Sequence, residues 1–341
     1  GCYRSVVVTV NPTPSSITGA SSVCAGSNTT FSGLPAGGTW LSSDATRASV
    51  VAGTGIVTGI AQGTAAISYI LSTGCRSHRV ITVNPVPVGI SGSATTCVGS
   101  TTLLSSSPVT GTWSSSNTAI AIVASTAGVI TGISAGTAVI TYMLLATGCN
   151  RTVVATINPL PATITGTASL CAGTSTTLTT TPTGGTWSSG TPAVATIGFA
   201  SGVANALSAG TAVITYRTTA GCLGTRILTV TPLANAGTIL GTPTFCEGTT
   251  VTLTATSAGG VWATANGKVS VSSLGAATGV TAGVDTVSYT VSNVCNTSVA
   301  RYVVTVNPLP IVGAISGQDT FCLGLTGTLA NAAIGGTWSS D

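Results

Sequence analysis

The stretch that decides the fold is Gly136-Thr137-Ala138-Val139-Ile140-Thr141-Tyr142. Its residues Ala138, Ile140 and Tyr142 occupy every second position. Side chains at every second position of a β-strand lie on the same face, and β-branched residues such as Val, Ile and Thr favour strands. We therefore expect a strand whose face with Ala138, Ile140 and Tyr142 is turned toward a core.

This stretch recurs because the chain is built of repeats. Each repeat opens with the motif I-x-G, passes a first cysteine in C-x-G, reaches a tryptophan in G-T-W or G-V-W, and ends at a second cysteine. The motif N-P-x-P closes three of the four complete repeats. The tryptophans are almost evenly spaced, at Trp40, Trp113, Trp187, Trp262 and Trp338. This regular period indicates one small folded unit per repeat.

Turn residues divide each repeat into short strands. In the second repeat we expect seven: a short strand before Cys97, one after it, one at Trp113, one ending near Tyr142, and strands over 119–123, 128–132 and 153–157. Seven short strands in about 73 residues make a compact sandwich of two sheets. The predicted fold class is all-β: a tandem array of seven-stranded immunoglobulin-like β-sandwich domains.

The aromatic residues of each repeat are the predicted core. The tryptophan is expected on the third strand and the tyrosine on the sixth. The core candidates are Trp40, Trp113, Trp187, Trp262, Tyr69, Tyr142, Tyr216 and Tyr289. A tryptophan can also serve as a platform for a sugar ring, but these tryptophans occupy the core position of their strand, so we favour burial.

The proline motifs place the predicted domain boundaries. Residues 12–85, 86–159, 160–232 and 233–308 are each expected to form one immunoglobulin-like domain. Residues 1–11 are expected to hold the last strand of a preceding domain, over 6–10, and residues 309–341 the first part of a further one. Because both ends fall inside a repeat, we expect a segment of a longer array, with short, stiff joints between its domains.

Three segments of the second repeat carry a resemblance to a known family. They are W-S-S at 113–115, A-I-A at 119–121 and G-V-I-T-G-I-S-A-G-T-A at 128–138, with equivalents in every repeat. The chain resembles the bacterial immunoglobulin-like repeats, of the group 2 and PKD-like kinds, in long surface proteins of Bacteroidota. The resemblance covers essentially the whole chain and implies a stalk or adhesin body at the cell surface. The fourth repeat departs from it at Thr231-Pro232-Leu233-Ala234, and at Gly283-Val284-Asp285-Thr286, where other repeats have G-T-A.

Charged residues are scarce. The 341 residues include nine Lys and Arg and five Asp and Glu, which is 4% charged residues, whereas an ordinary domain has about 25%. The basic residues form no dense patch, so nucleic acid is not an expected partner. No run of about 18 apolar residues is free of Gly, Thr, Ser and Pro, so we expect no membrane span.

The expected partners are the flanking repeats of the same chain, other copies in a filament or bundle, and covalent glycans. Candidate glycan sites are the sequons at Asn28, Asn150 and Asn296. The stretch Asp285-Thr286-Val287 is similar to the O-glycosylation site of Bacteroidota.

The ten cysteines indicate disulfides in an oxidising, extracellular compartment, since the chain has no C-x-x-C pair and one histidine. Two pairings are open. Pairing within repeats joins Cys24 to Cys75, Cys97 to Cys149, Cys171 to Cys222 and Cys246 to Cys295. Pairing between repeats joins Cys24 to Cys149, Cys97 to Cys222 and Cys171 to Cys295. It leaves Cys2, Cys246 and Cys322 without an assured partner.

The expected strand directions favour pairing between repeats. The first cysteine of a repeat follows the first strand, and the second cysteine lies in the turn between the last two strands. These turns are expected at opposite poles of one sandwich, farther apart than the roughly 7 Å between Cα atoms that a disulfide tolerates. Pairing within repeats stays open, because strand positions from one sequence can shift by several residues.

No enzyme active site is expected. The acidic residues Asp44, Glu247, Asp285, Asp319 and Asp341 lie at non-equivalent places, and His78 is expected in a solvated turn. The joints offer Asn and Pro instead of the carboxylates that calcium needs. We therefore expect no catalytic residue, no cofactor and no metal site.

The predicted function is structural: the repeat region, or shaft, of a secreted bacterial surface filament or giant adhesin. The alternative is a ligand- or glycan-binding immunoglobulin-like module with its specificity in the variable turns. A third interpretation, the accessory stalk of an enzyme, would need a catalytic domain outside these 341 residues.

Overall fold

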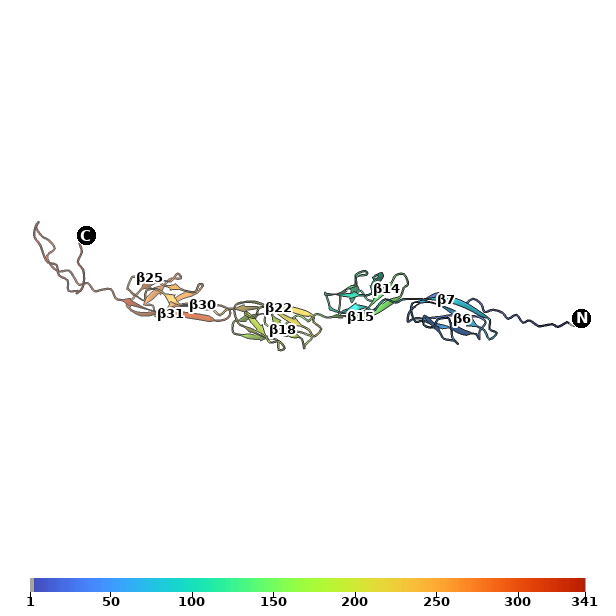
Figure 1. Ribbon diagram of the computed structural model, residues 1–341. Helices are drawn as coiled ribbons and strands as arrows, with labels where there is room; N and C mark the ends of the chain where they lie inside the picture. Colours follow the sequence, from blue (N-terminus) through green and yellow to red (C-terminus); the bar gives the residue numbers. More distant parts are fainter. Residues whose placement is uncertain (1–2, 341) are drawn as a thin grey trace. The chain divides into compact units, whose positions relative to one another are not determined.

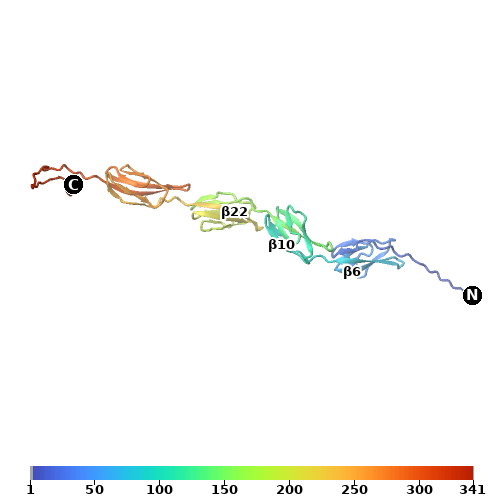
Figure 2. The same ribbon diagram turned by 90° about the horizontal axis from the view of Figure 1, so that it is seen from above.

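The chain folds as an all-β array. The computed structural model describes residues 3–340, which form strands β1 to β31 and no helix. The strands gather in four successive clusters along the chain (Figures 1 and 2), each with its own sheets. This architecture confirms the predicted tandem immunoglobulin-like β-sandwiches. Cys2 and Asp341 lie outside the described residues.

The first sandwich has a four-stranded sheet in the order β1-β7-β6-β3 and a three-stranded sheet in the order β2-β5-β4. The first strand, β1, pairs with the last, β7, in parallel. The strands are β1 (Ser22–Cys24), β2 (Asn28–Thr30), β3 (Thr39–Ser42), β4 (Ala48–Val50), β5 (Ile56–Gly59), β6 (Gly63–Ile70) and β7 (Arg76–Asn84).

The second sandwich has sheets in the orders β11-β14-β15-β9 and β12-β13-β10-β8. Its strands are β8 (Ser91–Gly92), β9 (Thr95–Cys97), β10 (Thr101–Ser105), β11 (Gly111–Ser115), β12 (Ala121–Val123), β13 (Val129–Gly132), β14 (Gly136–Leu144) and β15 (Asn150–Asn158). The strands expected over 119–123, 128–132 and 153–157 correspond to β12, β13 and β15.

The third and fourth sandwiches repeat this plan. The third has sheets β16-β22-β21-β18 and β17-β20-β19, and the fourth has sheets β24-β31-β30-β27, β25-β29-β28 and β23-β26. The strands of the third are β16 (Ser169–Cys171), β17 (Ser175–Thr177), β18 (Thr186–Ser189), β19 (Ala195–Ile197), β20 (Val203–Ala206), β21 (Gly210–Arg217) and β22 (Leu223–Thr231). Those of the fourth are β23 (Ile239–Leu240), β24 (Thr244–Cys246), β25 (Thr250–Thr252), β26 (Thr254–Ala255), β27 (Val261–Thr264), β28 (Val269–Val271), β29 (Ala276–Gly279), β30 (Gly283–Ser292) and β31 (Thr297–Asn307).

A glycine divides the first strand of the second repeat, where the sequence predicts one strand. Gly92, the glycine of I-x-G, has a φ of 104°, which favours glycine. A Cβ atom on Gly92 would lie 2.3 Å from the carbonyl oxygen of Leu103. Strand β8 pairs with β10 in one sheet, and β9 pairs in parallel with β15 in the other. The chain therefore changes sheets just after Gly92.

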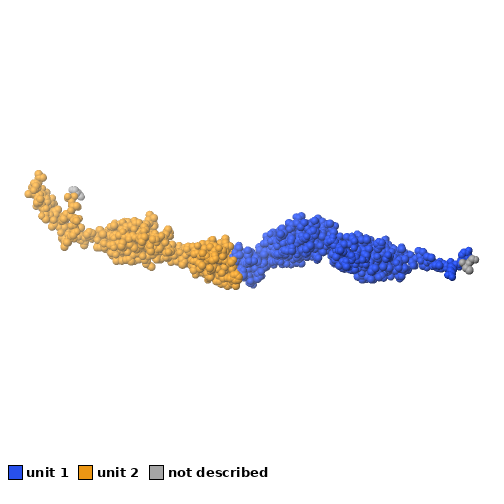
Figure 3. All heavy atoms as spheres, in the orientation of Figure 1, with its two compact units in different colours: residues 1–164, 180–186, 215–225 blue, residues 165–179, 187–214, 226–341 orange. Residues whose placement is uncertain are grey.

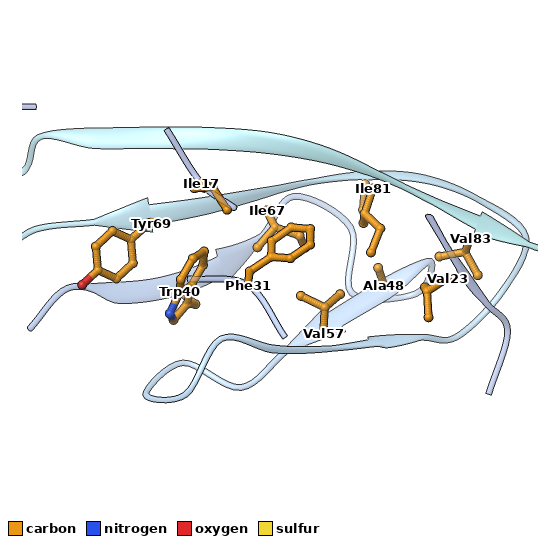
Figure 4. Close-up of a cluster of buried hydrophobic side chains, with 11 residues drawn as sticks. Ile17, Val23, Phe31, Trp40, Ala48, Val57, Ile67, Tyr69, Ile81 and Val83 are labelled. Carbon is orange, nitrogen blue, oxygen red and sulfur yellow. The ribbon is translucent and has the colours of Figure 1, made fainter. Parts of the chain in front are cut away.

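The alternating residues of the deciding stretch form the core. Ala138, Ile140 and Tyr142 on β14 are 3%, 0% and 2% exposed, whereas Val139 between them is 40% exposed. Trp113 on β11 lies opposite Tyr142 in the strand register, with ring centroids 4.6 Å apart. The first sandwich has the same arrangement at Trp40 and Tyr69 (Figure 4). Of the eight core candidates all are buried except Trp262, which is partly buried and packs against its core.

The core tyrosines also fasten the loop before the tryptophan. The Tyr142 hydroxyl accepts a hydrogen bond from the backbone N–H of Gly111 at 2.9 Å and donates one to the carbonyl oxygen of Pro108 at 2.5 Å. Tyr69 and Tyr216 make the equivalent two bonds. Each tyrosine thus satisfies its buried hydroxyl while it anchors a loop.

The segments at the two ends differ from the expectation. The strand expected over 6–10 is absent, because residues 3–16 make no strand pairing. No strand forms over 309–340 either, where one isolated bridge joins Ser316 to Ala330 and Trp338 is 58% exposed. A strand is stabilised by hydrogen bonds to neighbouring strands and by an apolar face that it shares with them. Within the described residues, neither end segment has a neighbouring strand to pair with.

Contacts between Cα atoms divide the chain into two compact units (Figure 3). Unit 1 comprises residues 1–164, 180–186 and 215–225, and unit 2 comprises residues 165–179, 187–214 and 226–341. The first two sandwiches lie in unit 1 and the fourth in unit 2, while the strands of the third are divided between them. The boundaries of the single domains remain predictions.

Candidate functional site

Within residues 3–340, no three His, Cys, Asp or Glu side chains lie close enough together to hold a metal ion. Hydrogen bonds from the hydroxyl and the backbone N–H of Thr46 lower the pKa of Asp44. Glu247 accepts a hydrogen bond from the backbone N–H of Ala282 at 2.5 Å. Asp44 therefore stabilises its own turn, whereas Glu247 fastens the segment before β30, 35 residues away in the sequence. No helix able to cross a membrane occurs in the described part of the chain.

Asp285 is a buried carboxylate with a structural environment. It lies on β30 at 1% exposure, where the other repeats have a buried alanine such as Ala138. Its Oδ1 accepts hydrogen bonds from the backbone N–H groups of Ala265, Asn266 and Thr286, and its Oδ2 accepts one from Val269, at 2.7 to 3.2 Å. Asp285 therefore holds the loop between β27 and β28. The sequence shows that Asp285 replaces the alanine of G-T-A. It gives no signal for the loop that Asp285 holds.

The disulfides join consecutive repeats. The bonded pairs are Cys24 with Cys149, Cys97 with Cys222, and Cys171 with Cys295. Their Cα atoms are 5.6 to 5.7 Å apart, an ordinary separation for a disulfide. In every pair the first cysteine of one repeat is bonded to the second cysteine of the following repeat. Of the two pairings open in the sequence, the structure has the one between repeats.

Strand geometry explains why the pairing within repeats is not formed. Cys97, at the end of β9, lies opposite Asn158, the last residue of β15. Cys149 directly precedes Asn150, the first residue of β15. A strand of nine residues at about 3.3 Å per residue spans more than 25 Å. The two cysteines of one repeat therefore lie at opposite ends of a long strand.

Two of the predicted disulfide residues are not bonded. Cys75 and Cys246 are free thiols, as is Cys322. With pairing between repeats, the partner of Cys75 would be a first cysteine before Cys24, and the partner of Cys246 a second cysteine after Cys295. Residues 1–341 contain neither. Pairing within repeats would join Cys75 to Cys24 and Cys246 to Cys295. The long last strand of each repeat, β7 or β31, separates these cysteines.

Three of the second cysteines, Cys75, Cys222 and Cys295, lie against the last residues before their own repeat. The Sγ atom of Cys222 is 3.9 Å from the carbonyl oxygen of Asn158, and the Sγ atom of Cys295 is 3.8 Å from that of Thr231. The free Cys75 makes the same contact, 3.7 Å from the carbonyl oxygen of Asn11. The free sulfur of Cys75 therefore has the same kind of neighbour as the bonded sulfurs of Cys222 and Cys295.

The joint before the fourth sandwich uses asparagines in place of a second proline. The Asn296 side chain accepts a hydrogen bond from the backbone N–H of Ala234 at 2.6 Å and donates one to its carbonyl oxygen at 3.3 Å. Asn293 donates to the carbonyl oxygen of Pro232 at 2.8 Å. The side-chain nitrogen of the Asn296 sequon is therefore engaged within the protein, whereas Asn28 and Asn150 are exposed.

The remaining ligand-binding candidates are mostly buried. Trp40, Trp113 and Trp187 are 5 to 6% exposed, so their faces are covered and cannot stack on a sugar in this structure. Asp285 and Val287, which flank Thr286, are 1% and 0% exposed. Thr286 itself points to the opposite face of β30 and is partly exposed. His78 lies on β7, opposite Ser68 of β6, rather than in a turn.

No known protein-family model matches the chain. No curated protein matches it. The similar solved structures include domains 1–6 of the surface layer protein SbsC, with 16% identity, a TM-score of 0.23, and coverage of 90% of this chain and 56% of that one. They also include Drosophila N-cadherin EC1-4, with 10% identity, a TM-score of 0.31, and coverage of 81% and 93%. The bacterial integrin-binding protein invasin matches with 13% identity, a TM-score of 0.32, and coverage of 89% and 81%. The chain thus spans little more than half of the SbsC segment.

Proposed function

We propose that this chain is the repeat region of an extracellular filament or giant adhesin on a bacterial surface, where it acts as a structural shaft. The observation that carries the proposal is the disulfide between each first cysteine and the second cysteine of the next repeat. Such a bond links two consecutive repeats of the chain, which is a mechanical role and not one in binding a ligand. Stable disulfides also require an oxidising compartment. The resemblance to Bacteroidota surface repeats suggests the source.

The composition supports the same role. Exposed Thr and Val side chains lie on the outer faces of the long strands, as at Thr137, Val139 and Val154, and few charges oppose contact between copies. A surface without charge repulsion permits chains to associate side by side. Partners in this proposal are the flanking repeats and other copies of the chain, with Asn28 and Asn150 as candidate glycan sites.

The rival function is ligand binding through the variable turns. Two observations weigh against it. The turn before the last strand holds the second cysteine, which is tied to the neighbouring repeat at Cys149, Cys222 and Cys295. The loop before the tryptophan is fastened by the tyrosine hydroxyl at Tyr69, Tyr142 and Tyr216. Neither turn is free to adapt to a ligand.

Electron microscopy of the secreted full-length protein tests the proposal. Antibodies raised against residues 86–159 should label unbranched fibres on the producing cells along their length. Label confined to fibre tips, or discrete particles that bind a defined glycan on an array, would support the rival function instead.

A further inference from the structure

The three disulfides overlap along the chain. They close loops between residues 24 and 149, between 97 and 222, and between 171 and 295. The first two loops share residues 97–149, and the last two share residues 171–222. Every peptide bond between Cys24 and Cys295 therefore lies inside at least one disulfide-closed loop.

We propose that these overlapping disulfides form a covalent load path that bypasses the sandwiches. Through it the array resists extension and stays in one piece when its backbone is cut. The inference follows from the covalent connections alone and does not rest on the proposed function. It would hold equally for a ligand-binding array.

The path is short. From Cys24 it crosses to Cys149, follows the backbone to Cys171, and crosses to Cys295. Fully extended at about 3.6 Å per residue, the backbone from Cys149 to Cys171 measures about 80 Å. The whole peptide chain from Cys24 to Cys295 would measure about 980 Å on the same basis. The disulfides therefore keep most of the backbone from extending.

The residues on the path belong to strands that are held in their sheets. Residues 149–171 contain β15, the joint and β16. Strand β15 lies inside its sheet, between β14 and β9, and is hydrogen-bonded on both sides. The strands that carry Trp113 and Tyr142 lie in a bypassed loop. A pulling force on the ends therefore reaches the aromatic cores only through neighbouring strands.

Two double variants with one disulfide removed separate this mechanism from a general loss of stability. In Cys24→Ser with Cys149→Ser, the shortest path follows the backbone from Cys24 to Cys97, crosses to Cys222, returns to Cys171 and crosses to Cys295. The backbone on this path measures about 450 Å when fully extended. In Cys97→Ser with Cys222→Ser, the short path through Cys149 and Cys171 is intact. Each variant loses one disulfide with the same sequence separation, so they are matched controls.

Pulling the 341-residue chain by its ends with optical tweezers measures the path. Without reductant, the maximal extension should be the same for the unchanged chain and the Cys97/Cys222 variant, and about 370 Å longer for the Cys24/Cys149 variant. With reductant, all three should reach one common, longer extension. In urea all three chains are unfolded, so the maximal extension then depends on the covalent path alone, even if a variant fails to fold. Equal extension of the two variants without reductant would overturn the proposal.

In a cleavage experiment the other variant, Cys97→Ser with Cys222→Ser, is the one that should differ from the unchanged chain. A protease site inserted after Leu160 lies only inside the loop closed by Cys97 and Cys222. After cleavage, the unchanged chain and the Cys24/Cys149 variant should run as one species on a non-reducing gel, and the Cys97/Cys222 variant as two. Two fragments from the cleaved, unreduced chain with all its cysteines would contradict the load path.

Discussion

Cys97 and Cys149 lie at opposite ends of strand β15, although both belong to the same repeat. Cys97 faces Asn158 at the end of this strand, and Cys149 precedes its first residue. One long strand thus prevents the bond that the spacing of the two cysteines suggests. It also brings each cysteine to the pole at which another repeat begins or ends. The disulfides between repeats follow from this placement, and the overlapping loops follow from the disulfides.

The hydroxyl of a core tyrosine should contribute measurably to the stability of its own sandwich. Tyr142→Phe removes the acceptor for Gly111 and the donor to Pro108, and we expect a loss of about 1–3 kcal/mol. Tyr289→Phe removes one hydrogen bond, from Gly260, among those of the described residues, so the loss should be smaller. Hydrogen exchange with mass spectrometry resolves the two sandwiches. Equal losses of stability in the two variants would show that the number of hydrogen bonds to the tyrosine hydroxyl does not determine the loss.

The glycine before β13 should tolerate no side chain. Gly128 has a φ of 69°, and a Cβ atom there would lie 2.4 Å from the carbonyl oxygen of Leu104. Gly99 has a φ of 77° but nothing within 4 Å of its Cβ position. Gly99→Ala should cost about 1–2 kcal/mol, for the backbone conformation alone, and Gly128→Ala clearly more. Urea denaturation of the second sandwich compares the two variants. Similar midpoints would show that contact with the carbonyl oxygen of Leu104 does not add to the cost at Gly128.

Asp285 should be required by the fourth sandwich alone. Asp285→Ala removes the carboxylate acceptor of four backbone N–H groups, of which that of Ala265 also bonds to the carbonyl oxygen of Thr286. We expect a loss of about 3 kcal/mol or more. Asp44→Ala is the control, because Asp44 is not buried and bonds only within its own turn; its effect should stay below about 1 kcal/mol. Faster hydrogen exchange should be confined to residues 233–308. An unchanged fourth sandwich would mean that the loop before β28 can rearrange around an alanine.

Each sandwich should remain folded when the disulfides are reduced. Separate apolar clusters occupy the first, second and fourth sandwiches, so the cores do not depend on the bonds. Closing a loop of 125 residues stabilises by up to about 5 kcal/mol through chain entropy. Reduction should therefore lower the melting temperature while circular dichroism at 25 °C still shows β-structure. Loss of the β-signal on reduction would show that the cores are insufficient alone.

The sequence predicts the fold closely where alternation and aromatic residues agree. The strand ending near Tyr142 and the strand at Trp113 are found as β14 and β11, in register, because burial of one face fixes both. The division of the first strand into β8 and β9 was not predicted. The backbone conformation of Gly92 and its approach to Leu103 become visible only when the two sheets are placed.

The features of the joints were harder to predict. The sequence favoured pairing between repeats but could not exclude the other, since the choice depends on the length of β15, which begins three residues earlier than expected. Asn293 and Asn296 carry no signal for their role at the joint, because their partners Pro232 and Ala234 lie far away in the sequence. Contacts at such separation depend on the tertiary fold.

Peptide mapping of the unreduced protein by mass spectrometry tests the central claim most directly. After digestion with thiols blocked, we expect the linked peptides Cys24–Cys149, Cys97–Cys222 and Cys171–Cys295. Recovery of Cys24 linked to Cys75, or of Cys97 linked to Cys149, would contradict the pairing between repeats and the load path built on it.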